Sequence, residues 1–329
     1  MTTVTADPIL EMPDRRVAGW RVVARKELAD HLQSIRFAIL LVLTALAGLA
    51  AVDSAAGEIR DVASAASGSP SVFLLLFTVS PDRIPSFLEL IGFLGPLLGI
   101  AFGFDAINAE RSAGTLPRLV SQPIHRDDVI TGKFAAGLAL IALAVVSLTA
   151  VVSGYGVVEL GITPGPGDLA RITTFALAGI VYVGVWLALA VLVSVVTRRS
   201  STAVLGCMAV WLVLTLFNGL VFGALADVIS PAGGDASAEE LIENARTEIA
   251  VSRISPEELY NEVSTVMLNP QIRTIGIVNP RQLDQTIPDT LPWDQSVLLV
   301  WPHIVALVAT IVVMFIAAFI LFMRQEVRA

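Results

Sequence analysis

The chain has 329 residues and a mass of 34.8 kDa, and its 29 acidic and 21 basic side chains give a formal net charge of −8. Hydrophobic residues make up 55% of the chain and charged residues only 15%, with a mean hydropathy of +0.77. A soluble globular chain carries about 25% charged residues, so the composition excludes a soluble enzyme and a disordered chain. It predicts an integral membrane protein surrounded by lipid. The acidic balance argues against a nucleic-acid partner.

Six apolar stretches are long enough to cross a bilayer as helices, which takes roughly 20 residues each. They are 37–56, 84–106, 134–158, 172–196, 200–226 and 295–323. The sequence therefore predicts an all-α integral membrane protein with six transmembrane helices. A further apolar run, 71–80, is too short to cross, and we expect it to form a re-entrant or interfacial piece.

An even number of spans places both termini on the same side of the membrane, and the distribution of Lys and Arg predicts which side. If the termini are inside, the inner segments hold fourteen of the 21 basic residues. Six precede the first span, four lie in the loop 107–133, two follow the fourth span and two follow the sixth. We therefore expect cytoplasmic N- and C-termini in a multi-pass protein of the plasma membrane.

The same pattern divides the chain into four parts. Residues 1–36 form a cytoplasmic N-terminus with an amphipathic helix, 37–226 hold spans one to five, 227–294 form an external helical segment, and 295–329 hold span six and a short tail. The external segment carries 12 acidic and 4 basic residues, and N-cap patterns at Ser237 and Ser255 predict two helices, the second ending near Leu268. Two interpretations stay open for this segment: a solvated cap, or a lid or docking surface on the exit side.

Motifs that carry catalytic chemistry are absent from the sequence. There is no HExxH, no GxSxG and no phosphate-binding GxxxxGK[ST], and the single Cys207 excludes an intramolecular disulfide. We therefore assign no catalytic, cofactor-binding or metal-binding residue, and we expect the chain not to hydrolyse ATP itself. The ionisable side chains within the predicted spans, Glu89, Asp105 and His303, lie near span ends, so we expect interfacial or helix-packing roles for Glu89 and His303.

Two cytoplasmic segments stand out instead. Residues 20–36 have the periodicity of an amphipathic helix lying at the membrane surface, with Trp20, Arg25, Lys26 and Glu27 in its first turns. The loop 107–133 is far longer than the two to eight residues, roughly, that usually connect helices. Within it Gly114 permits a sharp turn, Leu116 offers an apolar side chain, and Glu110 and Arg111 can fix the loop to neighbouring helices by charge pairing. Such a loop suits an interaction with a soluble partner.

The residues of this loop resemble those between spans two and three of ABC-2 type transporter permeases, in particular the subgroup that includes the permease of the nitrous-oxide-reductase maturation transporter. The matching positions are Asp105, Glu110-Arg111, Gly114-Thr115-Leu116, Pro123, Arg126 and Gly132-Lys133. The N-terminal stretch 24–37, with Lys26-Glu27, and the external stretch 255–270 are also similar to that family.

The resemblance implies the permease subunit of an ATP-binding cassette exporter, which pairs with a second permease copy or a related chain and binds a separate ATPase subunit. ATP would bind to that partner. The loop would then be the coupling region, comprising Glu110, Arg111, Gly114, Thr115, Leu116, Pro123, Arg126 and Lys133. The interfacial helix with Trp20, Arg25, Lys26 and Glu27 would flank it. The alternatives are a membrane scaffold or maturation factor, an intramembrane hydrolase, and a secondary transporter.

Overall fold

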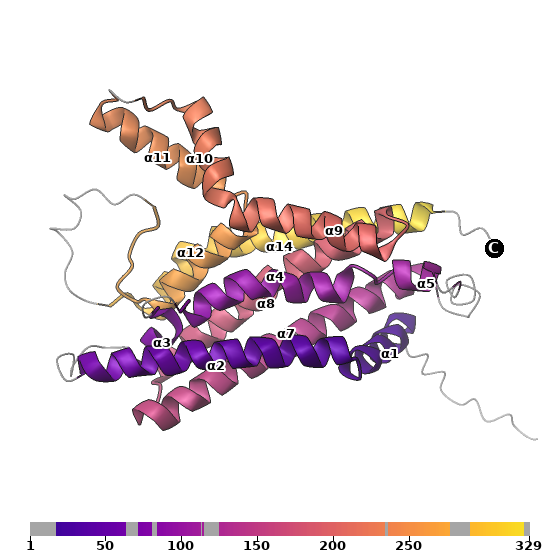
Figure 1. Cartoon of the computed structure of the whole chain (residues 1–329), viewed down its shortest axis with the longest axis horizontal. Coiled ribbons are helices and arrows are strands. Elements are labelled where there is room, and N and C mark those ends of the chain that lie inside the picture. Colours follow the sequence, from indigo (N-terminus) through magenta and orange to yellow (C-terminus); the bar gives the residue numbers. More distant parts are fainter. Residues whose placement is uncertain are drawn as a thin grey trace, which may run out of the picture.

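A computed structural model describes residues 18–63, 72–80, 84–112, 114, 125–233, 236–276 and 290–325, and all regular secondary structure within them is helical. The helices form one elongated bundle with an arm at one side (Figure 1). In chain order they are α1 (Gly19–Leu32), α2 (Ile35–Ala63), η1 (Val72–Leu74), α3 (Leu75–Thr78), α4 (Phe87–Gly103), α5 (Asn108–Ser112), α7 (Arg126–Leu160), α8 (Pro166–Val196), α9 (Ser200–Trp211), η2 (Leu212–Leu216), α10 (Asn218–Ile229), α11 (Ala238–Ser252), α12 (Pro256–Leu268) and α14 (Trp293–Arg324).

Five of the predicted spans are long, apolar helices in the structure. They are Phe37–Arg60 in α2, Phe87–Ser112 in α4 and α5, Arg126–Leu160, Pro166–Val196 and Trp293–Arg324. The structure thus confirms an all-helical chain with at least five helices able to cross a membrane by length and composition. A sixth crossing depends on the region predicted as span five.

That region, 200–226, is not one straight helix. Ser200–Leu216 and Asn218–Ile229 are bent by 66° relative to each other. The turn Leu212–Leu216 is a π-helix, and the Phe217 N–H donates to the Leu212 carbonyl five residues back, 2.9 Å away. Phe217 itself leaves the helical region, with φ −100° and ψ 13°. Apolar composition alone predicted an unbroken span, because a π-turn changes the hydrogen-bonding register without changing hydropathy.

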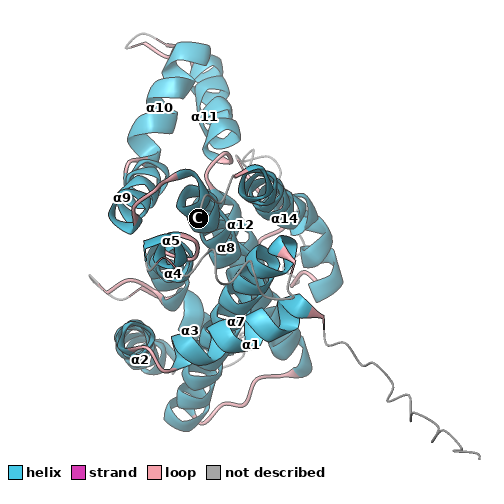
Figure 2. Ribbon diagram, turned by 90° about the vertical axis from the view of Figure 1, so that its right-hand side faces the viewer, coloured by secondary structure: helices cyan, strands magenta, loops and turns pink. Residues whose placement is uncertain are grey.

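Helices α4 and α8 pack against each other near the middle of the bundle (Figure 2). Their close approach depends on a row of glycines on α4, spaced four residues apart. A Cβ built on Gly99 would lie 2.6 Å from the Val183 carbonyl oxygen, and one on Gly103 would lie 2.7 Å from the Ala190 Cβ. The Tyr182 hydroxyl donates to the Gly92 carbonyl at 2.7 Å and adds a polar contact to this interface.

The short apolar run 71–80 forms η1 and α3 rather than a span. Phe73, Leu74, Leu76 and Phe77 are at most 1% exposed. The Phe77 ring lies 5.7 Å from that of Phe87 on α4, in an edge-on geometry. The prediction of a non-crossing segment is consistent with this structure, in which the run is held by packing into the bundle.

The predicted external segment contains two helices of different character. As the sequence predicted, Ser237 and Glu240 form a capping box at the start of α11, and the Ser255 side chain caps α12, which ends at Leu268. α10 and α11 form the arm that extends from the bundle (Figure 1). α12 instead packs on α8 and α14, with Tyr260, Val263 and Met267 fully buried. Of the two interpretations of the external segment, the solvated cap does not fit α12, because the apolar side chains on one face of this helix are part of the buried core.

Candidate functional site

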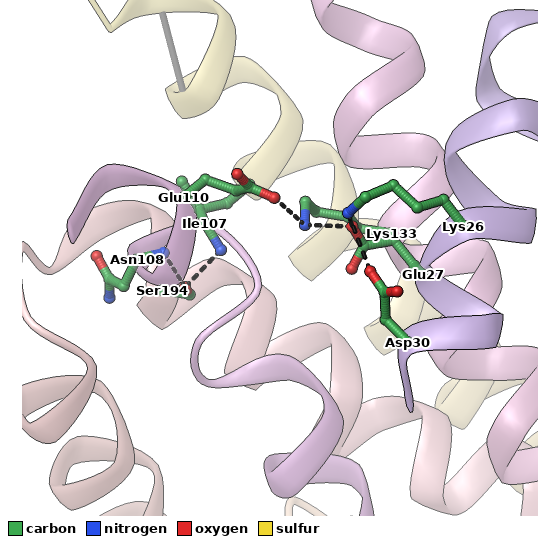
Figure 3. Close-up of polar contacts among 8 residues, drawn as sticks. All are labelled: Lys26, Glu27, Asp30, Ile107, Asn108, Glu110, Lys133 and Ser194. Carbon is green, nitrogen blue, oxygen red and sulfur yellow. Dashed lines mark hydrogen bonds and ion pairs between the residues drawn. The ribbon is translucent and has the colours of Figure 1, made fainter. Parts of the chain in front are cut away.

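Lys133 lies at the centre of a polar cluster at one end of the bundle. Its side chain, near the start of α7, is only 5% exposed, and Nζ lies 2.8 Å from Glu27 Oε1 of α1 and 3.4 Å from Glu110 Oε1 of α5 (Figure 3). A buried ammonium requires such partners, because the cost of removing its charge from water exceeds several kcal/mol. Three residues predicted from the sequence thus meet at one ionic contact that joins three helices.

Helix α1 is held on α7 by backbone contacts as well. The Trp20 N–H donates to Asp128 Oδ1 at 2.9 Å, and a Cβ on Gly132 would lie 2.7 Å from the Trp20 carbonyl oxygen. Lys26, on the outer side of α1, pairs with Asp30 at 3.0 Å, with more than half of its side chain exposed. Val23 is the one buried residue of α1, so the helix lies on the surface of the bundle. Its predicted position at the membrane surface stays a prediction.

Helix α5 is anchored on the end of α8. The Ile107 and Asn108 N–H groups both donate to Ser194 Oγ, at 3.1 and 3.3 Å (Figure 3). The Asn108 side-chain amide donates to Thr197 Oγ1 at 3.0 Å, and the Arg111 guanidinium donates to the Thr197 carbonyl at 2.7 Å. These bonds fix where the chain leaves the second span and where the long loop begins.

Gln325, directly after α14, connects the two ends of that loop. Its side-chain oxygen accepts a hydrogen bond from Arg111 Nη2 at 2.7 Å, and its backbone carbonyl accepts one from Arg126 Nη1 at 3.3 Å. Its amide Nε2 donates to the Val195 carbonyl at 2.7 Å. Gln325 was not predicted from the sequence, where its polar side chain just beyond the last apolar span is the only signal.

The predicted coupling residues are therefore only partly placed. Glu110 and Lys133 contact each other, while Arg111 and Arg126 meet at Gln325. Gly114 has φ +64°, the left-handed conformation that suits a sharp turn at glycine. Thr115, Leu116 and Pro123 of the predicted coupling region lie outside the residues that the structure describes.

A cavity of about 360 Å³ adjoins the Lys133 cluster. It lies between α1, the start of α2 and the end of α4. Its lining includes the charged residues Glu27, Asp30 and Lys133 and the aromatic residues Phe37 and Phe102. The end of the bundle that carries α1 and α5 thus has a cavity next to the Lys133–Glu27 ion pair.

A second polar cluster lies on α12 and α14, toward the other end of the bundle. His303 Nε2 lies 2.6 Å from Glu262 Oε2, and the Arg253 guanidinium makes a two-pronged contact with the Glu262 carboxylate at 2.8 and 2.9 Å. Burial raises the pKa of Glu262, but the hydrogen bonds from His303 and Arg253 outweigh it and hold that pKa below its usual value. His303 is thus a helix-packing residue, as expected, although its partner Glu262 was not foreseen.

Glu89 has a local structural role at the start of α4. Its carboxylate accepts a hydrogen bond from the Ser86 N–H at 2.8 Å, and the Ser86 hydroxyl accepts one from the Glu89 N–H at 3.3 Å. This is a capping box, which satisfies two backbone donors at a helix start. The sequence predicted an interfacial or helix-packing role for Glu89, and the structure shows that its side chain caps its own helix.

Comparison with known proteins assigns the fold to a family. The sequence profile of the ABC-2 family transporter proteins matches residues 21–327. A probable ABC transporter permease protein NosY of Stutzerimonas stutzeri is 32% identical over 211 residues, covering 62% of this chain and 69% of that protein. A probable ABC transporter permease protein NosY of Pseudomonas aeruginosa is 34% identical over 129 residues, covering 37% and 40% respectively. The family profile spans nearly all of the bundle described above, and the chain therefore belongs to the ABC-2 family of transporter proteins, as a multi-pass membrane protein of the permease type.

Proposed function

We propose that the chain is the membrane subunit of an ATP-driven exporter, forming the translocation path as a dimer with a second copy or a related permease chain. ATP is bound and hydrolysed by a separate ATPase subunit on the cytoplasmic side of the plasma membrane. Membership of the ABC-2 family and the similarity to two probable ABC transporter permeases support this role. No nucleotide-binding motif is present in the sequence, which leaves hydrolysis to a partner.

The single observation that carries the coupling proposal is the convergence at the Lys133 end of the bundle. α1, α5, the start of α7 and the residue after α14 are all joined there, through Lys133–Glu27, Lys133–Glu110 and Arg111–Gln325. Both ends of the loop 107–133 thus connect to the same group of contacts. A force applied to the loop by a partner would therefore reach four helices at once.

The predicted positive-inside orientation is consistent with this arrangement. Arg21, Arg25 and Lys26 on α1 lie at the end where α1 and α5 meet. Arg111, Arg126 and Lys133 lie there too, and the C-terminal end of α14 is joined to it. Placing this end in the cytoplasm puts the coupling region beside a cytosolic ATPase. The arm of α10 and α11 and helix α12 then lie toward the external side.

Charge reversal in the loop tests the coupling role. The double variant Arg111→Glu, Leu116→Asp removes a cation that donates to Thr197 and Gln325 and places a charge on the predicted apolar contact. We expect loss of the ATPase subunit on purification and normal membrane insertion. The matched control, Arg246→Glu with Leu241→Asp on exposed positions of α11, should retain the ATPase. Equal retention of the ATPase by both variants would contradict the coupling role.

A further inference from the structure

The arm formed by α10 and α11 leaves the bundle and returns to it at two neighbouring points (Figure 1). It leaves at Phe217, where the chain bends by 66°, and it returns through residues 253–255 into α12. The Ser255 hydroxyl donates to the Leu214 carbonyl at 2.9 Å, so a hydrogen bond joins the outgoing and the returning chain. The arm is therefore a helical hairpin that is pinned together at its base.

Within the arm, polar contacts hold α10 and α11 to each other. The Asn244 side-chain amide donates to Asp227 Oδ1 at 2.9 Å and to the Ser230 carbonyl at 2.7 Å. The hydroxyl oxygens of Ser230 and Thr247 lie 2.9 Å apart. These bonds cross from one helix to the other near the end of α10, so we expect the two helices to move as one body.

The base of the arm contains buried polar atoms that have no hydrogen-bond partner among the described residues. They are Thr215 Oγ1 in the π-turn, Trp211 Nε1 four residues before it, and Glu257 Oε2 in the first turn of α12. Each of these atoms is closed off from solvent. Buried polar groups are normally hydrogen-bonded, so the bent conformation leaves unsatisfied groups at the point where the chain bends.

An unbroken helix would satisfy the hydroxyl of Thr215. A threonine within an α-helix can donate to the carbonyl four residues back. Thr44, Thr173 and Thr310 do so in α2, α8 and α14, at 2.7, 2.7 and 2.8 Å. Thr215 lies in the π-turn instead and makes no such bond to the Trp211 carbonyl. Straightening of this region would therefore gain a hydrogen bond for Thr215.

The bent conformation gains a different hydrogen bond in exchange. In an unbroken α-helix the Leu214 carbonyl accepts the N–H of Asn218, four residues on. The bend turns this carbonyl to α12, where Ser255 donates to it. Each conformation thus satisfies a polar group that the other does not, and this is the property of a hinge with two positions.

From this geometry we propose that the α10–α11 arm swings as one body about Phe217 and residues 253–255, and that the Ser255–Leu214 hydrogen bond is the latch that holds the arm in its bent position. In the second position the region 200–229 is straighter, and Thr215 donates to the Trp211 carbonyl. Such a movement would reshape the exit side of the translocation path, and that use rests on the proposed export function. The hinge itself lies within the chain, so it is measured without an ATPase.

The test measures spin-label distances in the detergent-purified full chain with Cys207→Ala, mixed with excess unlabelled chain so that both labels lie in one molecule. Leu205→Cys in α9 with Val228→Cys in α10 spans the bend, at positions that are 68% and 79% exposed. Leu220→Cys with Leu241→Cys, also exposed, is the reference pair within the arm. We expect two distance populations across the bend, with the shorter one larger, and a single narrow distance within the arm.

Two variants should shift the populations in opposite directions. Ser255→Ala removes the latch and should enlarge the longer-distance population at least threefold. Thr215→Val keeps the side-chain shape but removes the hydroxyl, so it should reduce that population at least threefold. Ser237→Ala is the matched control, because it removes the N-cap of α11 as Ser255→Ala removes that of α12, but its side chain bonds only within α11. It should leave the populations unchanged.

Thr215→Val keeps the test decisive if Ser255→Ala does not fold. A single narrow distance across the bend in the wild type and in each folded variant would overturn the proposal. An equal shift in Ser237→Ala and Ser255→Ala would overturn the latch, and a reference pair that shifts with the first pair would show that the arm does not move as one body. Because no ATPase is present, failure here is distinguishable from failure of the proposed export function.

Discussion

Lys133 Nζ lies 2.8 Å from Glu27 Oε1, so a single ionic contact joins the start of a spanning helix to the interfacial helix α1. Both side chains are almost completely buried, at 5% and 12% exposure, and Glu110 completes the cluster. In a surface helix such a contact would contribute little, but burial makes it expensive to leave either charge alone. The cluster thus fixes α1, α5 and α7 as one unit.

Removing the Lys133 charge should destabilise the chain. Lys133→Met keeps much of the side-chain volume but leaves the Glu27 and Glu110 carboxylates buried together, so we expect a loss of about 3–5 kcal/mol in the free energy of unfolding. Thermal unfolding in detergent measures it. Lys26→Met is the matched control, because Lys26 is more than half exposed, and it should change the stability little. An equal loss of stability in Lys133→Met and Lys26→Met would show that the Lys133 cluster does not stabilise the fold more than an exposed ion pair does.

Gln325→Ala should separate coupling from assembly. The variant removes the acceptor of Arg111 and the donor to Val195 while keeping the backbone contact with Arg126. We expect the ATPase subunit to remain bound but the ATPase activity per bound subunit to fall severalfold, because Arg111 is no longer held to the residue that follows α14. Gln271→Ala, at an exposed position near α12, is the control. Unchanged specific activity would remove Gln325 from the coupling account.

The glycines of α4 give a steric prediction. Gly99→Ala places a methyl group 2.6 Å from the Val183 carbonyl oxygen, and backbone atoms cannot move aside cheaply. We expect a loss of about 1–3 kcal/mol from overpacking. Gly154→Ala in α7 meets nothing within 4 Å and should instead gain about 0.5–1 kcal/mol through lower backbone entropy. Thermal unfolding of both variants decides whether α4 and α8 are as close as described.

Glu257 provides a pH prediction. Burial raises its pKa to about 7, above the ordinary value of 4.5, and among the described residues its Oε2 has no hydrogen-bond partner. The folded state therefore binds a proton more tightly than the unfolded state, so this residue lowers the stability progressively as the pH rises from about 4.5 to about 7. Above that range the loss is complete.

The variant Glu257→Gln should remove this pH dependence. Its melting temperature should equal that of the wild type near pH 4.5, exceed it increasingly up to about pH 7 and exceed it by a constant amount above that. Glu239→Gln, at an exposed position, should follow the wild type throughout. A difference between Glu257→Gln and the wild type that is the same at all pH values would contradict a raised pKa.

The sequence predicted most of the spans because hydropathy and helix length are local properties. Ser237 and Ser255 predicted two helix starts correctly for the same reason, since an N-cap is read from three or four neighbouring residues. The break at Phe217 was missed, because a π-turn leaves the apolar composition unchanged. The burial of α12 was missed as well, because the acidity of the whole segment outweighed the apolar stripe around Tyr260.

Some residues of the candidate site could likewise be identified from the sequence, and others could not. Glu110, Arg111 and Lys133 were identified by their places around a long loop. Glu110 does form an ion pair, with Lys133, whereas Arg111 is held by hydrogen bonds to the uncharged Thr197 carbonyl and Gln325 side chain. Gln325 and Glu262 were not identified, because their partners Arg111 and His303 are distant in the sequence. Contacts of this kind depend on how helices pack, which a single sequence does not specify residue by residue.

The central claim is that this chain works with a separate ATPase, and co-purification tests it most directly. The tagged chain is extracted from its own cells in mild detergent, and the eluate is assayed for subunit composition and ATPase activity. The account predicts a stoichiometric nucleotide-binding subunit that is lost when residues 114–120 are replaced. A pure chain with no associated ATPase, or one whose ATPase remains after that replacement, would contradict it.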